Sequence, residues 1–368
     1  MNNLCDPSQE SLTSHDLQKT KKKLAKKVKY LQKKPQPPQK SEEWFKARQT
    51  RITASEAASC LTKSQKVCEP YVKQFNLSNF KYKENEQLNP YESKQDYIIK
   101  KCEGFFGEAV FKDTVFTLWG KRYEEVANLL YAKLYNKKVI EFGLLPHSRL
   151  KWLAASPDGI TTDGVMLEIK CPKSRKIDET CIPLYYYIQV QIQLEVADLE
   201  ECDFVECEIE EINEQDFLVR KPIGKQDKGI IFCKKDNAQE HIYPNTSIST
   251  LEDYIHWRDT WLQTDNNLIP VYYFITKYHI HNIKRSREWF AAVKDDIKKT
   301  WELVSKLQSN KEEFLKYKES VHLIKSKSYF EKYNSTFCLI EDDETEFVHA
   351  SFKEEEEEEC CLINSSDN

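Results

Sequence analysis

Two carboxylates and a lysine within residues 152–170 have the types and spacing to do chemistry together. Alternation with period two at the end of this stretch predicts a strand with Glu168 and Lys170 on one face. The Asp-Gly pair at 163–164 predicts a hairpin turn that brings Asp158 back beside Glu168. Neighbouring carboxylates repel each other unless a cation separates them, and a hard divalent ion such as Mg2+ suits oxygen ligands. The lysine can then hold or deprotonate a water, or stabilise an oxyanion.

An ordinary exposed hairpin with a surface ion pair is the alternative interpretation. For Glu168 and Lys170 alone, that alternative is the better one. It becomes less favourable because Pro157-Asp158 is followed ten residues later by Glu168-x-Lys170, which is the PD-(D/E)xK pattern of Mg-dependent nucleases. The pattern is loose and matches many sequences by accident, so the rest of the chain has to support it.

The composition is that of a folded protein without a membrane span. The chain has 368 residues, which suggests two domains or one enlarged domain with appendages. No apolar run approaches the ~20 residues of a transmembrane helix, and the polar, lysine-rich start does not resemble a secretory signal. Twelve cysteines without a CxxC pair or a zinc-type cluster predict free thiols in a reducing compartment. We therefore expect an intracellular protein, nuclear or cytoplasmic.

Charge is distributed unevenly along the chain, whose net charge is -5. Residues 1–40 are predicted to be disordered, because ten lysines and no acid lie between residues 19 and 40. A short basic helix that breaks at the prolines is the only structure expected there. Such a segment is typical of a nuclear localisation signal, a non-specific DNA tether or a solubilising tail. Residues 311–368 are predicted to be an extension whose six glutamates, at 354–359, form a solvated acidic tail.

Between these segments, residues 41–310 carry the patterns of a folded domain. Weak signals at 213–265 suggest an insertion. Helical spacing and period-two alternation predict, respectively, helices at 119–135, 184–199 and 286–307 and strands at 138–145, 202–212 and 271–283.

An arginine and a serine near the start of this domain suggest an anion site. Arg48 precedes Ser55 by seven residues, and Ser55 has the character of a helix N-cap. Arginines beside a capped helix N-terminus can form a phosphate cradle. The alternative is a surface helix with solvated arginines, which is the better interpretation without a further motif.

Two predicted helices can contribute polar side chains to the hairpin. Glu124 lies next to the apolar stripe of its helix and can reach inward. Tyr186, Gln189 and Gln193 share one face of the helix at 184–199, where glutamines can order water and phosphate oxygens beside a metal, although such a face is usually solvated. The buried stripe of the same helix is predicted to consist of Tyr185, Ile188, Ile192 and Val196.

Four separated segments, taken in order, resemble the lambda-exonuclease-like, or YqaJ-type, viral recombinases among the PD-(D/E)xK nucleases. These segments are RITAS with Arg48 before it, WGKRYE ending at Glu124, SPDG with LEIKCP, and YYIQVQ from Tyr186. The resemblance covers roughly residues 41–204 and 271–307. It implies an α/β (α+β) fold with a restriction-endonuclease-like core, in which helices flank a mixed central β-sheet.

The resemblance also implies roles for individual residues. Lys170 would position or activate the attacking water, and Gln189 would help to place that water or the scissile phosphate. The residues implied are, as catalytic groups, Asp158, Glu168, Lys170, Glu124 and Gln189; as metal ligands, Asp158, Glu168 and the carbonyl of Ile169; and as 5'-phosphate or DNA contacts, Arg48, Ser55 and Tyr186.

The implied activity is Mg2+-dependent 5'-to-3' exonuclease action on duplex DNA ends with a 5'-phosphate, with Mn2+ as a substitute metal. DNA recombination with a single-strand annealing partner would be the setting. The ring-shaped trimer of part of the family stays open, because inserted surfaces can block or replace an interface. A structure-specific endonuclease and a non-catalytic DNA-end-binding protein on a nuclease scaffold are the competing interpretations. Intact Asp158, Glu168 and Lys170 argue against the second of these.

Overall fold

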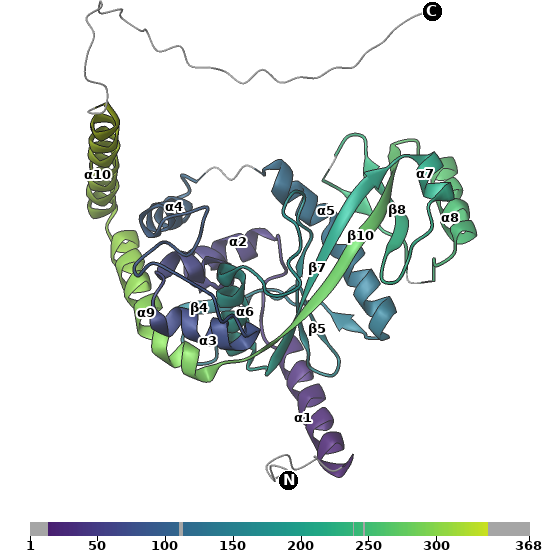
Figure 1. Ribbon diagram of the computed structural model, residues 1–368, viewed down its shortest axis with the longest axis horizontal. Helices are drawn as coiled ribbons and strands as arrows, with labels where there is room; N and C mark the ends of the chain where they lie inside the picture. The colour runs from purple at the N-terminus through teal and green to yellow at the C-terminus, as the bar shows by residue number, and fades with distance from the viewer. Residues whose placement is uncertain (1–13, 110–112, 238, 246, 338–368) are drawn as a thin grey trace, which may run out of the picture. The chain divides into compact units, whose positions relative to one another are not determined.

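The computed structural model describes residues 14–109, 113–237, 239–245 and 247–337, and it divides into two compact units (Figure 1). The first unit, Met1–Lys316, contains both sheets. The described part of the second unit, Tyr317–Asn368, is helical and belongs to α10 (Lys311–Phe337). In the described ranges, no helix combines the length and apolar character needed to cross a membrane.

A seven-stranded mixed sheet is the centre of the first unit, with the strand order β2-β5-β6-β7-β10-β8-β9. Only the central pair β6–β7 is parallel, whereas every other neighbouring pair is antiparallel. A parallel pair needs a long crossover, and α6 (Leu184–Ala197) supplies it. The strands are β2 (Val139–Ile140), β5 (Gly159–Thr161), β6 (Met166–Lys170), β7 (Glu201–Ile212), β8 (Asp227–Lys234), β9 (His241–Ile242) and β10 (Leu268–Lys284).

A second sheet, of three short strands, joins the start of the domain to the hairpin region. Its order is β1-β4-β3, with β1 parallel to β4 and β3 antiparallel to it. Ile52 pairs with Leu153, so the segment after Arg48 runs beside the strand that precedes Asp158. The strands are β1 (Ile52–Thr53), β3 (Leu145–Pro146) and β4 (Leu153–Ala155).

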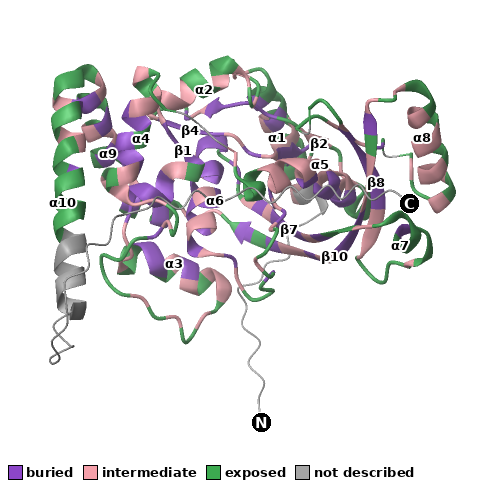
Figure 2. Cartoon of the chain, turned by 90° about the horizontal axis from the view of Figure 1, so that it is seen from above, coloured by how far each residue is buried: buried purple, intermediate pink, exposed green. Residues whose placement is uncertain are grey.

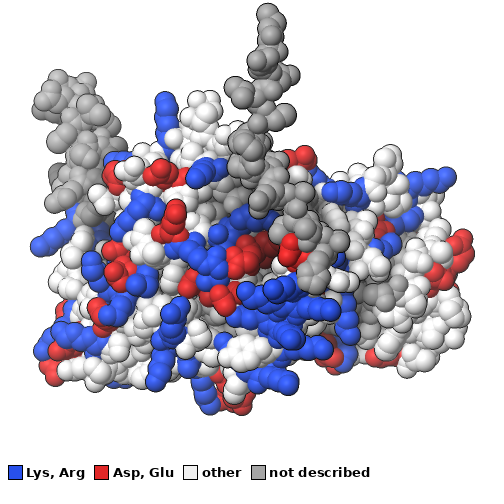
Figure 3. Space-filling model, turned by 90° about the horizontal axis from the view of Figure 1, so that it is seen from below, with Lys and Arg blue, Asp and Glu red and all other residues white. Residues whose placement is uncertain are grey.

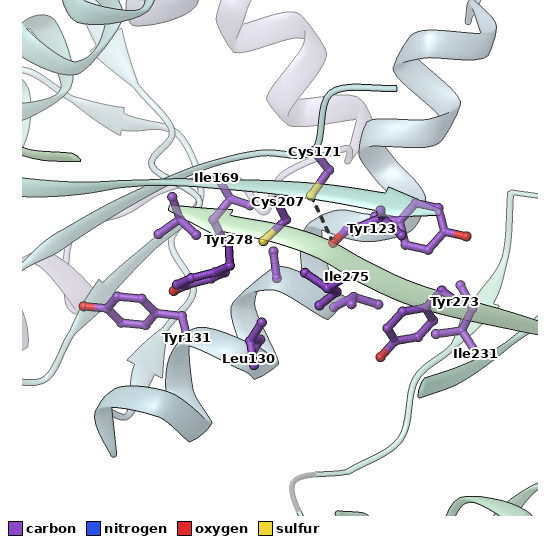
Figure 4. Packing of buried hydrophobic residues seen from close by; sticks show 14 of the residues in the cluster. Tyr123, Leu130, Tyr131, Ile169, Cys171, Cys207, Ile231, Tyr273, Ile275 and Tyr278 are labelled. Atoms are coloured by element: carbon purple, nitrogen blue, oxygen red, sulfur yellow. Dashed lines mark hydrogen bonds between the residues drawn. The ribbon is translucent and has the colours of Figure 1, made fainter. Parts of the chain in front are cut away.

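Helices cover both faces of the central sheet, as predicted for this fold class. Period-two alternation turns Leu167 and Ile169 of β6 towards α5, where they join a buried cluster with Tyr123 and Leu130 (Figure 4). Glu168 points to the opposite face, towards α6. The remaining helices are α2 (Glu42–Gln49), the 3-10 helix η1 (Ala54–Cys60), α3 (Gln65–Phe75), α4 (Lys94–Phe106), α5 (Val115–Tyr135), α7 (Glu214–Val219), α8 (Leu251–Thr264) and α9 (Arg287–Ser309).

The periodic segments fold much as expected, with one difference. The helices predicted at 119–135, 184–199 and 286–307 correspond to α5, α6 and α9. The strand expected at 138–145 is instead divided between β2 and β3, which belong to different sheets. Buried residues concentrate in the strands and in the helices packed on them (Figure 2). The eight cysteines in the described part of the chain are free thiols, as predicted.

Residues 14–40, predicted to be disordered, are instead ordered and packed. They form α1 (Ser14–Gln32), followed by an extended segment through the prolines. Val28 and Leu31 of α1 are only 2% and 1% exposed. A composition dominated by lysine does not predict such complete burial. The prolines end the helix, as expected.

The extended segment after α1 is hydrogen-bonded into the domain. The side chain of Gln36 accepts a bond from the Gly143 amide (2.7 Å), and the carbonyl of Pro37 accepts one from Leu144 (3.0 Å). A Cβ on Gly143 would lie 2.1 Å from the Pro37 oxygen, so only glycine allows this approach. Gln39 donates to the carbonyls of Phe142 (2.9 Å) and Pro157 (3.0 Å). The segment therefore supports the loop that carries Asp158.

The segment 213–265, predicted to be an insertion, extends the central sheet. It forms α7, β8, β9 and α8, and β8 pairs with β10 from Leu268 to Ile275. The acidic tail at 354–359 lies outside the described residues.

Replacing Leu31 with alanine tests whether α1 is part of the folded domain. Because Leu31 is almost fully buried, we expect Leu31→Ala to lower the free energy of unfolding by about 2–5 kcal/mol in urea denaturation. The exposed lysine of the same helix, changed in Lys26→Ala, should alter it by less than about 0.5 kcal/mol. Equal effects of the two variants would contradict the docking of α1.

Candidate active site

The predicted hairpin is confirmed, and its register sets the site. β5 and β6 are antiparallel, with Gly159 opposite Leu167, and Gly164 occupies the turn with a φ of +91°. Asp158 therefore stands just before β5, beside the end of β6. Its Oδ2 accepts a hydrogen bond of 2.7 Å from the backbone amide of Ile169.

Glu168 is a buried carboxylate, 1% exposed, whose two oxygens are both hydrogen-bonded. Oε1 accepts from the Lys170 ammonium and from Gln189 Nε2, the latter at 2.6 Å. Oε2 accepts from Gln193 Nε2 at 2.6 Å. A buried carboxylate is tolerated only when it is paired and hydrogen-bonded, and these donors meet that need.

The electrostatics of the site are dominated by negative charge. Burial, followed by the Glu168 and Glu124 carboxylates, raises the pKa of Asp158 well above its usual range. Burial alone would lower the pKa of Lys170, but the Glu168 and Asp158 carboxylates raise it, so the side chain is an ammonium ion. Lys170 Nζ lies 5.1 Å from the ring centroid of Tyr186, within cation-π range.

Glu124 contributes through its charge rather than by contact. It is half-buried on α5, and burial raises its pKa, with a further contribution from Glu168 in the same direction. It does not line the cavity that holds Asp158 and Glu168. The role of Glu124 at the site, including metal coordination, therefore stays a prediction.

A cavity of about 140 Å3 joins the acidic residues to the predicted phosphate segment. Its wall includes Asp158, Glu168 and Lys170 as well as Arg48 and Ser55. The fold thus brings together two groups of residues that are about 110 positions apart in the sequence, through the β1–β4 pairing. The remaining lining residues are Gln39, Trp44, Thr53, Ala54, Ser156, Gln189 and Gln193.

Arg48 is held in place by its neighbours. Its Nη2 donates to Ser55 Oγ at 3.4 Å and lies 3.5 Å from a carboxylate oxygen of Glu56. The guanidinium carbon is 4.4 Å from the ring centroid of Trp44, and Trp44 Nε1 donates to Ser156 Oγ at 2.9 Å. Arginine and serine therefore form one polar corner of the cavity, as predicted.

The predicted N-cap is wrong. Thr53, not Ser55, caps η1, and η1 is a 3-10 helix of seven residues rather than an α-helix. The Thr53 amide donates to Glu56 Oε2 at 2.9 Å, because Glu56 closes a capping box with Thr53. An anion at this corner would therefore be bound by side chains, and an α-helix N-terminus does not contribute.

The sequence patterns did not predict a buried ion pair next to Arg48. Lys101 of α4, 3% exposed, donates to both carboxylate oxygens of Glu56 at 2.7 and 2.9 Å. Burial alone would raise the pKa of Glu56, but Lys101 and Arg48 hold it below its usual value, so it stays charged. Glu56 therefore fixes the position of Arg48.

The glutamine helix contributes one residue more than the resemblance assigned. Gln193, four positions after Gln189, is 1% exposed and also bonds to Glu168. Their shared helix face was visible in the sequence, but helical spacing could not show that both reach one carboxylate. Gln191 faces away and donates to the Lys284 carbonyl at 2.8 Å. Gln39 and Trp44, which also line the cavity, gave no signal in the sequence.

Comparison with known proteins agrees with this geometry. Residues 43–200 match the model of the YqaJ-like viral recombinase domain. An uncharacterized protein of Acanthamoeba polyphaga mimivirus is 26% identical over 365 residues, a match that covers 85% of this chain. The chain spans 61% of the length of that relative.

Solved structures of exonucleases align with this chain only at low TM-scores. An alkaline exonuclease from Laribacter hongkongensis aligns with a TM-score of 0.43 and 19% identity, covering 76% of this chain and 98% of that one. A phage related exonuclease from Haemophilus somnus 129PT aligns with a TM-score of 0.36 and 11% identity, covering 70% and 95%. The assignment depends on the family match and on the motif residues gathered in the cavity. Residues 43–200 of this chain are therefore similar to the YqaJ-like viral recombinase domain.

Proposed function

We propose that this protein is a metal-dependent deoxyribonuclease that degrades duplex DNA from a 5' end. The observation that carries the proposal is the cavity in which Asp158, Glu168 and Lys170 meet Arg48 and Ser55. Hydrolysis of a phosphodiester needs neutralised phosphate charge and a nucleophile at neutral pH. The first three residues suit that chemistry, and the last two suit an anion held beside it.

The donor set fits a divalent cation. Asp158 and Glu168 offer hard carboxylate oxygens, and the Ile169 carbonyl is the third predicted ligand. The raised pKa of Asp158 marks negative charge that the protein does not fully compensate. The described residues contain no group of three His, Cys, Asp or Glu side chains arranged for a metal. Mg2+ is often held by only one or two carboxylates and keeps several waters, so two carboxylates and a carbonyl are compatible with it. When bound, Mg2+ or Mn2+ would neutralise phosphate charge and provide a hydroxide-like water.

The protein's own residues have separate tasks in this proposal. Gln189 and Gln193 hold the Glu168 carboxylate in one orientation through their amide hydrogen bonds. Lys170, as an ammonium ion, orients the attacking water or stabilises the developing negative charge. Arg48, stacked on Trp44, and Ser55 receive the 5'-phosphate and so set which phosphodiester lies over the carboxylates.

A basic surface supports DNA as the substrate. Figure 3 shows Lys and Arg side chains gathered on the lower face of the molecule, where α1 lies. Lysines on such a surface release counterions from the phosphate backbone and strengthen binding at low salt. A trimer and a single-strand annealing partner stay predictions.

Replacing the residues of the acidic cluster tests the catalytic assignment. We expect Asp158→Asn, Glu168→Gln and Lys170→Ala each to lower the rate of DNA cleavage in Mg2+ by about 100-fold or more, because each removes a charge from the site. The exposed surface acid changed in Glu210→Gln should leave the rate unchanged. Circular dichroism checks that each variant is folded. A folded variant of the three with wild-type cleavage would remove that residue from the mechanism.

The raised pKa of Asp158 predicts that the stability of the metal-free protein depends on pH. The folded protein binds the Asp158 proton more tightly than the unfolded chain does. In EDTA the wild type should therefore lose stability relative to Asp158→Asn as the pH rises above 3.8, the usual pKa of the carboxyl, towards the raised value. Urea denaturation at a series of pH values measures the difference.

The exposed acid changed in Asp295→Asn serves as the control and should show no such trend. Adding Mg2+ should stabilise the wild type and leave Asp158→Asn unchanged. A pH-independent difference between wild type and Asp158→Asn would mean that the carboxylate is already compensated without metal.

Arg48 is predicted to determine the preference for a 5'-phosphate. A hydrogen bond to a charged group contributes about 1.5–3 kcal/mol, so Arg48→Ala should slow cleavage of 5'-phosphorylated duplex by roughly 10- to 150-fold. Cleavage of 5'-hydroxyl duplex should change much less. Lys101 keeps Glu56 paired in this variant, so the fold should persist. Arg51→Ala is the matched control, because Arg51 donates to the Ala47 carbonyl and does not line the cavity.

The ratio of the two rates is the measurement. Equal losses on both substrates would make Arg48 structural and would favour a structure-specific endonuclease. Cleavage of circular duplex DNA by the wild type would favour the same alternative. Binding of DNA ends without any cleavage in Mg2+ would favour the end-binding protein.

A further inference from the structure

Three tyrosine rings lead from the candidate active site to the protein surface. At the inner end, the Lys170 ammonium lies 5.1 Å from the ring centroid of Tyr186. The rings of Tyr186 and Tyr185 are 4.2 Å apart, and Tyr185 meets Tyr91 edge to face, with centroids 6.1 Å apart at 85°. Tyr91 is 81% exposed. We call Tyr186, Tyr185 and Tyr91 the tyrosine row.

The outer end of this row is held rigidly. The Tyr91 amide donates to Asn89 Oδ1 at 3.0 Å, and Asn89 Nδ2 donates to Ser59 Oγ of η1 at 2.8 Å. Ser59 in turn donates to Glu92 at 3.2 Å. The backbone on both sides of Tyr91 is therefore tied to η1, which carries Ser55. An exposed aromatic ring on a fixed backbone presents its faces to solvent at a defined place.

The middle of the row is aligned with the residues that hold Glu168. Tyr185, Gln189 and Gln193 are spaced by four residues along α6, so they follow one face of the helix. Tyr185 lies four residues before Gln189, about 6 Å along the helix axis, and Gln189 bonds to Glu168. The sequence predicted Tyr185 to be buried. Instead Tyr187 takes the buried place, at 1% exposure, and Tyr185 is half-exposed.

Packing alone does not explain the outer ring. A tyrosine that is 81% exposed buries little apolar area, and an edge-to-face pair contributes only about 0.5–1.5 kcal/mol. The charges beside the row indicate what it could bind. Lys170 and Arg175 both lie over the Tyr186 ring, with Arg175 at 6.0 Å. The row therefore has two cations at its inner, partly buried ring and an exposed aromatic ring at its outer end. Proteins that bind single-stranded nucleic acids combine positive charge for the phosphates with aromatic rings for the bases.

We propose that the exposed ring of Tyr91, with Tyr185 packed against it edge to face, forms a stacking platform for an unpaired nucleobase of the strand held at the Asp158–Glu168 site. This inference rests on the proposed nuclease function and goes further, because it specifies the state of the strand at the site. Bases inside a duplex are stacked on both faces, so a base must lie at an end or be released from its pair to reach the platform. The platform therefore favours a frayed, overhanging or single-stranded end, where an unpaired base can turn towards Tyr91.

Binding of single-stranded oligonucleotides in EDTA tests this inference without cleavage. We expect Tyr91→Ala to weaken binding about 5- to 150-fold by fluorescence anisotropy, because base–aromatic stacking is lost. Tyr91→Phe keeps the ring and should bind like the wild type. Tyr135→Ala, which removes a 39% exposed tyrosine at the end of α5, should have no effect.

Abasic probes identify the base that is stacked. A series of oligonucleotides carries an abasic site at successive positions from the 5' end. Wild type and Tyr91→Ala should have equal affinity for the one oligonucleotide that lacks the stacked base, and different affinities for all the others. A factor that stays the same at every position would show that Tyr91 acts structurally, and would overturn the inference. Wild-type binding by Tyr91→Ala to the intact probe would overturn it as well.

A measurement on the wild-type protein tests the same inference without relying on a variant, which could be misfolded. With 2-aminopurine at the position found by the abasic series, or at each position in turn, binding should quench the fluorescence of one base by stacking. Binding without quenching at any position would overturn the platform and leave the proposed nuclease function intact. Failure of the wild type to bind any of these probes or duplex DNA would overturn both.

Discussion

Burial of the Glu168 carboxylate beside a second acid is the constraint on which the site depends. A carboxylate that is 1% exposed needs a donor for each oxygen, and Lys170, Gln189 and Gln193 provide them. Asp158 accepts a hydrogen bond from the Ile169 amide, and burial together with the Glu168 and Glu124 carboxylates raises its pKa. The protein therefore compensates one acid almost completely and leaves the other with excess negative charge. A divalent cation would restore the balance, which is why the arrangement suits metal-assisted hydrolysis.

The parallel pairing of β6 with β7 explains how these donors arrive. Parallel neighbours cannot be joined by a tight turn, so the chain must cross the sheet face before β7 begins. α6 makes that crossing on the face to which Glu168 points, and α5 covers the face occupied by Leu167 and Ile169. One connection thus brings both glutamines to Glu168. The same helix carries Tyr185 and Tyr186 in its first turn, so two rings of the tyrosine row and both glutamines that bond to Glu168 lie on one helix.

The N-terminal part of the domain connects the polar corner formed by Arg48 and Ser55 to the hairpin. Gln39, which precedes α2, bonds to the Pro157 carbonyl, and Trp44, within α2, bonds to Ser156. Both residues therefore hold the loop before Asp158. Glu56, which is paired with the buried Lys101, holds Arg48 through a second ion pair. Removing one partner of a buried pair is costly, which makes this corner a rigid part of the fold. Rigidity matters to the proposed function, because a terminal phosphate bound here would set the position of the bond to be cut.

Local sequence determined the features that depend on short spacing. Alternation and an Asp-Gly turn were enough for the hairpin, because strand faces and turn geometry depend on residues two to five apart. The stripe that buries Trp289 on α9 was predictable for the same reason. The motif residues Asp158, Glu168 and Lys170 followed from the hairpin, and Arg48 and Ser55 from resemblance to a family.

Tertiary structure decided everything that depends on a distant partner. Composition predicted disorder for residues 1–40, yet two apolar side chains of α1 find a buried place that no local pattern reveals. Gln39 reaches Pro157 across 118 positions, and Lys101 reaches Glu56 across 45. The exchange of Tyr185 and Tyr187 between surface and core depends on where η1 and α3 pack against α6. Helical spacing fixes which residues share a face, whereas only the packed neighbours decide which face is buried.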